Sequence, residues 1–471
     1  MKLGRLGQGL AAAAVLLVAG CGQKEAAAPA GEGAAKVLTN FTLIDGTGAP
    51  AAPGSAMVLG PDGKIAWVGP QAQLKAPEGA QTVDLSGKYV MPGLIDLHVH
   101  LGNVVDLKQD YRNFTRENVE KDLKTYASYG VTTVLSMGTE GDLIFPMRDA
   151  QRAGKPTMTR IYTAGQGIVF KGGYGGVPGL NQPVTTPEEA TAAVDAQAAK
   201  GVDVIKFWLD DELGTMPKMP PAISKAIIDA AHKNNLKVLA HIFYLEDAKR
   251  VVDQGVDGLV HSVRDQPVDA ALINAMKAKG TWQLAETLSR EASMFAYGVP
   301  PSEILNDPFF VAGVSPAALA ELRSPERQKT VASGPHFHDY PKFFEMAKAN
   351  TKRLADGGVK YGFGTDSGPP GRFPGYFSHW ELALLADSGL SPAQALQAGT
   401  GTAAQALQAI TAATGGAAKF LGAQDIGVLA AGKQADLLVL DADPLADIKN
   451  SRKINSVYIA GQQVPSIKPA A

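Results

Sequence analysis

Short apolar segments alternate with longer mixed segments through the middle of the chain. Buried parallel strands appear in a sequence as continuous apolar runs, and helices usually connect them. Several intervening segments are long enough for helices, for example Pro187–Lys200, Pro220–Asn235 and Tyr340–Asp356. The predicted strands are Leu94–His100, Val131–Met137, Met158–Ala164, Val204–Phe207, Val238–His241, Leu259–His261, Trp282–Leu284 and Tyr361–Asp366.

Eight strand–helix units indicate a (β/α)8 TIM barrel, which we place at residues 91–421. A doubly wound parallel sheet is the alternative, but such folds usually carry a glycine-rich phosphate loop after the first strand. The predicted first strand has no loop of that kind, so the α/β barrel is the favoured fold class.

Both ends of the chain show a different pattern, in which short strands are separated by glycine-containing turns. We therefore predict a small β-sandwich domain that is built from both chain ends, residues 36–90 and 422–465. Its predicted strands are Lys36–Ile44, Ala56–Leu59, Ile65–Val68, Ala435–Leu440 and Lys453–Ile459.

The first residues have the pattern of an export signal. A basic start precedes the apolar run Leu10–Ala19, which is too short to span a bilayer but fits a secretory signal. The run ends in Val18-Ala-Gly-Cys21, which resembles the lipobox of bacterial lipoproteins. We therefore predict a lipoprotein signal peptide at residues 1–20 and lipid attachment at Cys21. An ordinary secretory peptide with an incidental cysteine is the alternative.

Residues 21–35 are rich in Ala, Gly, Pro and Glu and are predicted to form a flexible tether. The residue after the cysteine is Gly22 and not Asp. In Gram-negative lipoproteins, the absence of Asp at this position usually implies sorting to the outer membrane. We accordingly expect an exported cell-envelope lipoprotein at the periplasmic face of the outer membrane.

The amino-acid composition excludes some partners and some kinds of catalytic site. The chain has 471 residues, of which 45% are hydrophobic, and a formal net charge of −2. A nucleic-acid partner requires a basic face, so we expect none. Cys21 is the single cysteine, which excludes internal disulfides and cysteine-ligated zinc. Histidines and carboxylates must therefore carry the chemistry, and the partner is expected to be a small-molecule substrate.

Four of the eight histidines fall where predicted strands end. His98 and His100 alternate on the first strand, so their side chains share one face. His241 and His261 close two later strands, and Asp366 closes the last. A lone strand histidine is more often a core residue than a ligand. Independent core histidines, however, have no reason to gather at the carboxyl ends of strands, where barrel enzymes hold their active sites.

Lys206 lies inside the predicted strand Val204–Phe207, where a buried ammonium is costly unless it is neutralised or paired. Imidazole and carboxylate groups suit zinc and similar divalent ions. Two such ions about 3.5–4 Å apart can hold one hydroxide and lower its pKa. A neutral Lys206 can supply the anionic bridge between them as a carbamate, and Asp366 can accept the proton of the hydroxide.

The segments that carry these residues together resemble the metal-dependent amidohydrolase superfamily. Within it, the chain is similar to the imidazolonepropionase-like and Xaa-Pro dipeptidase (prolidase)-like branch, which includes ochratoxin-hydrolysing amidases. The resemblance extends from about Lys36 to Val464. It rests on Pro92-Gly-Leu-Ile-Asp-Leu-His-Val-His100, Val202-Asp-Val-Ile-Lys206, Ala240-His241, Gly258-Leu-Val-His261, Gly364-Thr-Asp366-Ser and Gly432-Lys-Gln-Ala-Asp-Leu437.

The resemblance implies a role for each of these residues. His98 and His100 would bind the more buried of two metals, and His241 and His261 the other. Lys206 would be the carboxylated bridge, and Asp366 a metal ligand and the base. Some imidazolonepropionase-like members hold a single metal and lack the lysine, so Lys206 favours two metals.

Three further residues are candidates for contact with the substrate. Tyr244 follows His241 by three residues and is a candidate to polarise the scissile carbonyl, with packing at a helix start as the alternative. Arg264 and Arg372 are candidates to bind a substrate carboxylate, with structural ion pairs as the alternative. The glycine-rich segment 172–176 resembles a substrate-facing loop. His336 and His338 are expected to be loop residues.

The predicted function is hydrolysis of an amide bond in a dipeptide or N-acyl amino acid by a lipid-anchored amidohydrolase with two divalent ions, of which zinc is preferred. A lactone or cyclic-amide hydrolase with the same site is one alternative. A lipid-anchored ligand-binding protein without turnover is another. The sequence leaves the oligomeric state open, and a homo-oligomer is one option.

Overall fold

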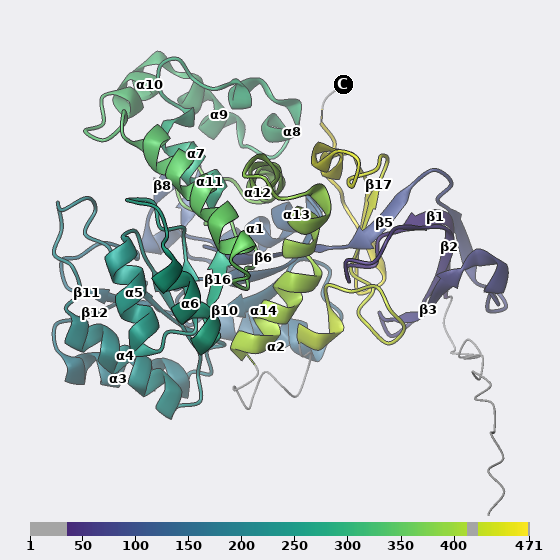
Figure 1. Cartoon of the computed structure of the whole chain (residues 1–471). Helices are drawn as coiled ribbons and strands as arrows, with labels where there is room; N and C mark the ends of the chain where they lie inside the picture. Colours follow the sequence, from purple (N-terminus) through teal and green to yellow (C-terminus); the bar gives the residue numbers. More distant parts are fainter. Residues whose placement is uncertain (1–34, 412–422, 470–471) are drawn as a thin grey trace, which may run out of the picture.

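The computed structural model describes residues 35–411 and 423–469. Its centre is an α/β arrangement of two parallel sheets (Figure 1). One sheet has the order β10-β9-β6 and the other the order β12-β11-β13-β14-β15-β16. These strands are β6 (Leu94–Val99), β9 (Val131–Ser136), β10 (Arg160–Thr163), β11 (Ile168–Phe170), β12 (Gln182–Val184), β13 (Ile205–Trp208), β14 (Val238–His241), β15 (Gly258–Val260) and β16 (Trp282–Ala285).

Main-chain hydrogen bonds connect the two parallel sheets at both edges. The amide of Asp203, just before β13, donates to the carbonyl of Thr163 at the end of β10. On the other side, segment 361–367 lies between β16 and β6, where Tyr361 bridges Gln283 and Ser367 bridges Val99. The predicted α/β fold with parallel sheets is confirmed.

The predicted strand at Tyr361–Asp366 is wrong, because this segment pairs with its neighbours through isolated bridges and single main-chain hydrogen bonds rather than through a continuous ladder. Gly362 and Gly364 lie so close to neighbouring strands that a β-carbon would meet the Leu284 carbonyl and the His98 main chain at 2.4 and 2.8 Å. Asp366 then turns to a positive φ of 56°, which ends any extended run. The segment therefore passes between two strands without forming a regular ladder.

Helices surround the parallel sheets. Two of them, α1 and α3, are capped at their starts by Thr115 and Thr186, whose side chains accept hydrogen bonds from main-chain amides of the first turn. The first seven are α1 (Arg116–Ser128), α2 (Ile144–Ala153), α3 (Pro187–Ala199), α4 (Pro221–Lys233), α5 (Leu245–Gln254), α6 (Ala270–Lys279) and α7 (Leu288–Ala296).

Three short helices after α7 form a separate layer at the top of Figure 1, before the chain returns through α11. The remaining helices are α8 (Pro308–Val311), α9 (Pro316–Arg323), α10 (Pro325–Ala332), α11 (Tyr340–Asp356), α12 (Tyr376–Asp387), α13 (Pro392–Ala398) and α14 (Gly401–Thr411).

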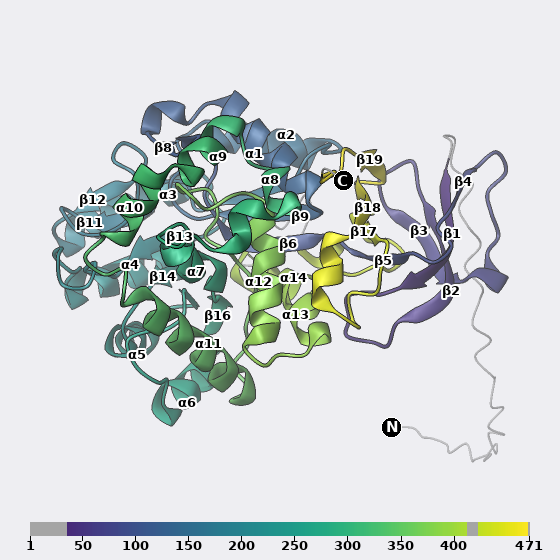
Figure 2. The same ribbon diagram turned by 90° about the horizontal axis from the view of Figure 1, so that it is seen from above.

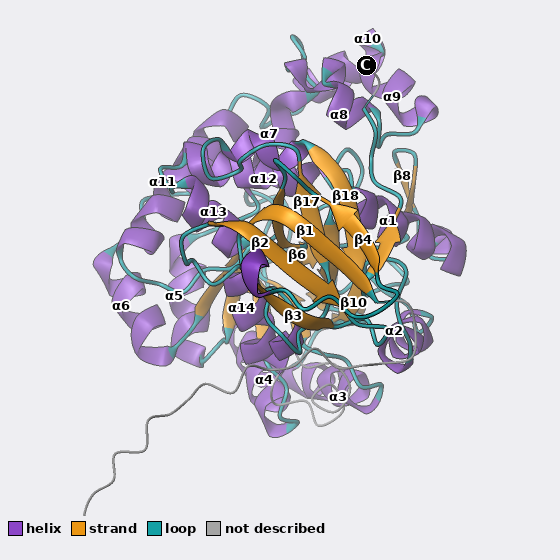
Figure 3. Ribbon diagram, turned by 90° about the vertical axis from the view of Figure 1, so that its right-hand side faces the viewer, coloured by secondary structure: helices purple, strands orange, loops and turns teal. Residues whose placement is uncertain are grey.

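A separate, mostly antiparallel sheet lies on one side of the molecule, away from α3–α6 (Figures 1 and 2), and faces the viewer in Figure 3. Its order is β19-β18-β17-β5-β1-β2-β3, with β4 paired to β1, so both chain ends contribute. Its strands are β1 (Lys36–Leu43), β2 (Ala52–Leu59), β3 (Ile65–Pro70), β4 (Gln81–Asp84), β5 (Tyr89–Pro92), β17 (Leu437–Leu440), β18 (Ile454–Ile459) and β19 (Gln462–Val464).

A buried ion pair connects this sheet to the parallel part. Nε and Nη2 of Arg160, at the start of β10, donate to the carboxylate of Asp436 at 2.9 and 3.1 Å. The same carboxylate accepts from the amide of Ala460, and the main-chain carbonyl of Asp436 accepts from Gly93. The sandwich arrangement and the predicted domain boundaries stay predictions.

The predicted signal peptide, Cys21 and most of the predicted tether lie outside the described residues. Among the residues that are described, no helix combines the length and apolar character that a membrane span requires.

Candidate functional site

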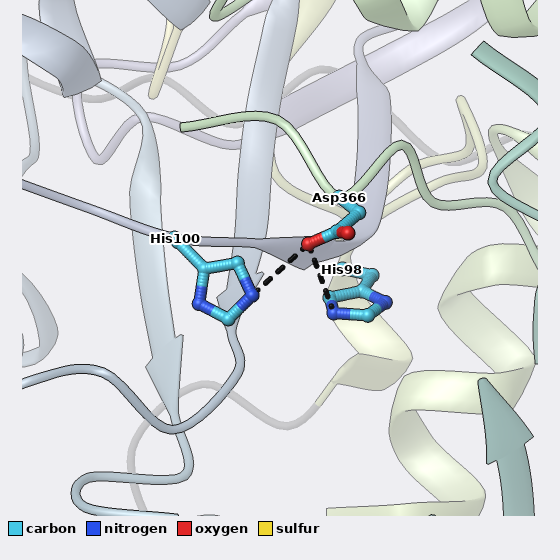
Figure 4. Close-up of side chains that lie close together, drawn as sticks. All are labelled: His98, His100 and Asp366. Carbon is cyan, nitrogen blue, oxygen red and sulfur yellow. Dashed lines mark ion pairs between the residues drawn. The ribbon is translucent and has the colours of Figure 1, made fainter. Parts of the chain in front are cut away.

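Two histidines at the end of β6 meet an aspartate from segment 361–367 (Figure 4). Oδ1 of Asp366 lies 3.0 Å from Nε2 of His100 and 3.5 Å from Nε2 of His98. All three side chains are buried, and their ligand atoms lie within 4.8 Å of one another. The amide of Asp366 donates to the carbonyl of His98 at 2.7 Å, so the main chain holds the two segments together.

Two more histidines lie beside this cluster. His241 ends β14 and His261 follows β15. The ring centroids of His98 and His261 are 4.9 Å apart, and those of His261 and His241 are 4.1 Å apart. The structure therefore brings together all four histidines that the sequence predicts as metal ligands.

Lys206, on the neighbouring strand β13, completes the predicted set. Its Nζ is buried without a hydrogen-bond partner and lies 4.3 Å from the ring centroid of Trp208. Burial lowers the pKa of Lys206 to about 7, although the charges of Asp366 and Glu140 oppose the shift. A neutral amine is the form that can react with carbon dioxide.

The backbone is strained where these side chains converge. His261 has a φ of 70° and Asp366 a φ of 56°, and Thr287 beside His261 has a φ of 57°. Residues with a β-carbon seldom adopt this left-handed region, and those that do are concentrated at functional sites.

Three of the four histidines have one ring nitrogen fixed by a neighbour. Asp210 accepts a hydrogen bond from Nε2 of His241 at 2.9 Å. Nδ1 of His100 is hydrogen-bonded to Thr139 Oγ1 at 2.9 Å. A similar bond of 2.7 Å joins Nδ1 of His261 to Thr287 Oγ1. Metal-binding histidines are typically oriented in this way, with the second ring nitrogen free for the ion.

The remaining histidine, His98, has no hydrogen-bond partner on either ring nitrogen, although both atoms are buried. A buried polar atom without a partner is costly and calls for an explanation. A divalent ion held by His98, His100 and Asp366 would supply a partner for Nε2 of His98, the nitrogen that faces Asp366. The donor set and its unpartnered atoms therefore fit a metal centre.

The protonation states also suit metal binding. Burial holds the pKa of His98 and of His261 well below the usual value and lowers that of His241 to about 4. Burial alone would raise the pKa of Asp366, but Arg372 and the two nearby histidines hold it well below its ordinary value. Neutral imidazoles and an ionised carboxylate are the forms that coordinate metal ions.

A cavity of about 210 Å³ opens onto this cluster. Its polar and charged lining includes His100, His241, His261 and Asp366. The other lining residues are Gln109, Thr139, Tyr174, Gly175, Gly176, Val177, Trp208, Pro369 and Arg372.

The three predicted substrate contacts differ in their positions. Arg372 lines the cavity, and its Nη1 donates to Oδ2 of Asp366. Tyr244 donates its hydroxyl hydrogen to Oδ1 of Asp211 at 2.8 Å. Arg264 is buried, donates to two main-chain carbonyls and lies 3.3 Å from Oε1 of Glu291. Neither Tyr244 nor Arg264 belongs to the described residues that line this cavity.

Sequence reasoning missed three residues around the site. Asp210, which orients His241, and Arg290, whose Nε lies 3.7 Å from Oδ2 of Asp366, carry no motif that would identify them. Tyr174 lines the cavity from the glycine-rich segment 172–176, the one signal that pointed to it. His336 lies in a turn, with Nδ1 3.6 Å from Asp339.

Comparison with known proteins identifies the family to which the chain belongs. Residues 89–464 match the model of the amidohydrolase family. The chain belongs to this family. The match begins in β5 and ends at β19, so it includes every predicted metal ligand of this amidohydrolase.

Two relatives are similar to this amidohydrolase over different lengths of the chain. An imidazolonepropionase of Deinococcus radiodurans is 24% identical over 431 residues, which cover 87% of this chain and 92% of the relative. The uncharacterized protein Rv2915c of Mycobacterium tuberculosis is 26% identical over 187 residues, 39% of this chain. The aligned part spans about half of that relative, 47% of its length.

Two solved structures share the fold. A candidate prolidase from Bifidobacterium longum has 27% sequence identity and a TM-score of 0.71, covering 93% of this chain and 96% of the other. A Xaa-Pro dipeptidase with bound methionine in its active site has 22% identity and a TM-score of 0.68, covering 91% and 99%. The predicted resemblance to the prolidase and imidazolonepropionase branch is confirmed.

Proposed function

We propose that this amidohydrolase hydrolyses an amide bond in a dipeptide or N-acyl amino acid. The observation that carries the proposal is the cluster of four imidazoles and Asp366 beside one small cavity, which His100, His241, His261 and Asp366 line. Lys206 is buried on the nearby strand β13, where the charges of Asp366 and Glu140 act on its amine. The similarity to a candidate prolidase over nearly the whole chain favours a substrate of dipeptide size.

Two divalent ions, with zinc as the preferred metal, fit the donor set. His98 and His100 would hold one ion, and His241 and His261 the other. Lys206 would bridge them as a carbamate, because its buried amine has no other partner. Ions bound there would supply an activated water, since a divalent cation lowers the pKa of a water that it binds.

Asp366 is proposed as the general base and then the general acid. Its carboxylate is ionised, and Oδ1 faces the imidazole cluster while Oδ2 accepts from Arg372. It would take a proton from the attacking water and pass it to the leaving amine nitrogen. Arg372, on the cavity wall, is the candidate to bind the carboxylate of the leaving amino acid.

A second candidate function keeps the site and changes the bond to a lactone or a cyclic amide. The imidazolonepropionase relative, similar over 87% of this chain, favours this alternative. A ligand-binding protein without turnover is the third reading, and the same assay separates all three.

The decisive experiment is a product screen by mass spectrometry on purified protein supplied with zinc and bicarbonate. The panel contains Xaa-Pro dipeptides, other dipeptides, N-acetyl amino acids, lactones and cyclic amides. We expect about two zinc ions per chain and turnover of an amide, with both lost in His98→Ala and Lys206→Ala. Binding without product for every compound, or full activity of those two variants, would refute the proposal.

We further propose that the two parallel sheets and segment 361–367 close into a (β/α)8 barrel, residues 91–421, and that the sheet from both chain ends packs as a small β-sandwich. We also propose that the chain is exported and anchored in the envelope by lipid on Cys21. Metabolic labelling with radioactive palmitate tests the anchor. The label should enter the wild-type protein and be absent from Cys21→Ala.

A further inference from the structure

Tyr174 is placed to contact a substrate and has a hydroxyl hydrogen to donate. It belongs to the loop between β11 and β12 and lines the cavity, with its ring centroid 5.2 Å from that of His241. Its hydroxyl oxygen accepts a hydrogen bond from Nη2 of Arg290 at 3.2 Å. Within the described part of the chain, no acceptor lies within hydrogen-bond distance of its own hydrogen, which is therefore free to point into the cavity.

Arg290 lies between this hydroxyl and the proposed base. Its guanidinium is buried in α7, and Nη1 donates to Glu291 Oε1 at 2.7 Å. Its Nε has no hydrogen-bond partner and lies 3.7 Å from Oδ2 of Asp366. One rigid, planar group therefore spans the distance between Asp366 and Tyr174, and a hydrogen bond from a cation makes the hydroxyl a stronger donor.

Tyr244, the tyrosine that sequence analysis favoured for this role, is engaged elsewhere. Its hydroxyl hydrogen is donated to Asp211, and Nζ of Lys218 lies 3.9 Å from its ring centroid. A hydroxyl that already donates to a carboxylate has no second hydrogen for a substrate carbonyl.

We propose that Tyr174 donates a hydrogen bond to the carbonyl oxygen of the scissile amide while negative charge develops on that oxygen, and that Arg290 positions it. The inference rests on the proposed amide hydrolysis. The water oxygen bonds to the carbonyl carbon, and the π electrons move to the carbonyl oxygen. Asp366 takes one proton of the water, and it gives this proton to the nitrogen as the C=O double bond re-forms and the C–N bond breaks. Tyr174 keeps its proton throughout. Burial raises the pKa of its hydroxyl, which therefore stays protonated near neutral pH.

The test compares Tyr174→Phe with the wild type on the best amide of the panel. Removal of one donor to a developing oxyanion costs roughly 100- to 1,000-fold in kcat, and we expect a loss of that size with KM changed by less than about threefold. Zinc content and thermal unfolding should be unchanged. Tyr111→Phe, at an exposed tyrosine outside the cavity, is the matched control and should keep full activity.

A binding measurement gives a second readout that does not depend on turnover. An N-phosphonyl analogue of the amino acid product carries a tetrahedral, anionic phosphorus in place of the carbonyl carbon. By calorimetry, Tyr174→Phe should bind this analogue roughly 100-fold more weakly than the wild type does, whereas the free amino acid should bind both equally.

Arg290→Lys is tested alone and in combination with Tyr174→Phe. Arg290→Lys should lower kcat in the wild type and have little further effect in Tyr174→Phe, because it acts through that hydroxyl. The inference is overturned if Tyr174→Phe keeps kcat within about twofold, if only KM changes, or if Tyr244→Phe carries the kcat loss instead. Absence of amide hydrolysis by the wild type would instead refute the proposed function.

Discussion

At the scale of single residues, hydrogen bonds with neighbouring side chains decide the orientation of the imidazoles. Thr139 Oγ1 accepts a hydrogen bond from Asn103 Nδ2 at 3.0 Å and lies 3.3 Å from Oε1 of Glu140, which can only accept. The threonine hydrogen therefore goes to Glu140, and Thr139 must accept from Nδ1–H of His100. Nε2 of His100 is left as the lone pair that faces Asp366.

The same reasoning predicts the effect of changing Asp210. Burial would raise the pKa of this carboxyl, but the hydrogen bond from His241 and the charges of Arg264 and Arg290 hold it below its usual value, so it stays ionised. Asp210→Asn removes the charge that orients His241. We expect zinc affinity to fall about 10- to 100-fold, measured by competition with a chromogenic chelator. Asp253→Asn, a change at an exposed carboxylate on α5, should leave zinc affinity unaltered, and an unaltered affinity in Asp210→Asn would contradict this role.

At the scale of elements, a short irregular segment carries the proposed base. Segment 361–367 is held by buried Asp96, which accepts from the amide and the hydroxyl of Thr365 and from the hydroxyl of Ser378 in α12. Asp96 also accepts from the amide of His98. One carboxylate therefore fixes the relative positions of β6, the Asp366 segment and α12.

This segment also marks what the sequence could and could not predict. Continuous apolar runs such as Val238–His241 are strands because burial on both faces decides their conformation. Segment 361–367 has a similar run, but the close approach of its glycines to other strands is a tertiary effect. Four predicted histidine ligands and Asp366 fall near the ends of predicted strands, and Lys206 is a cation inside an apolar strand, so each has a recognisable place in the sequence. Asp210 reaches the site through the fold of the loop after β13, and Arg290 reaches it through the position of α7. No local sequence pattern predicts either position.

Helix α12 makes a pH-dependent contact through His379. Its ring nitrogens are hydrogen-bonded to the Ser451 hydroxyl and to the Tyr129 carbonyl, and burial lowers its pKa from 6.5 to about 4. On acidification the unfolded chain takes up this proton before the folded chain does. The contribution of His379 to the free energy of unfolding is therefore complete above pH 6.5 and is lost as the pH falls towards 4. The shift corresponds to about 3 kcal/mol in the free energy of unfolding.

Urea unfolding between pH 4 and 8 tests this expectation. The difference in free energy of unfolding between the wild type and His379→Gln should shrink on acidification from pH 6.5 to 4. Ser451→Ala breaks the same contact without removing a titrating group, so its difference from the wild type should stay nearly constant with pH. Parallel curves for the wild type and His379→Gln would contradict the assignment.

At the scale of the whole molecule, the two structural parts are joined by a buried charge pair. Arg160 and Asp436 have side chains that are 6% and 4% exposed, and Gln434 Oε1 accepts from the same guanidinium. Removal of one partner from a buried pair leaves an uncompensated charge, which costs about 3–5 kcal/mol.

We therefore expect Asp436→Ala to lower the free energy of unfolding by about 3–5 kcal/mol in urea titrations. The surface pair of Lys88 with Asp441 provides the control, since both side chains are at least 32% exposed. Asp441→Ala should cost about 1 kcal/mol or less, as exposed pairs usually do. Equal effects of the two changes would show that the buried pair does not hold the two parts together.

The pairing of β5 with β17 has a consequence for synthesis of the chain. Residues 89–92 leave the ribosome long before residues 437–440, so the nascent polypeptide carries an unpaired strand edge while all of the catalytic part is being made. Exposed edges invite pairing with other chains. A ribosome that stops before residue 437 would release a product that contains every predicted metal ligand and an aggregation-prone edge, so premature termination near the end should yield inclusion bodies rather than a smaller enzyme.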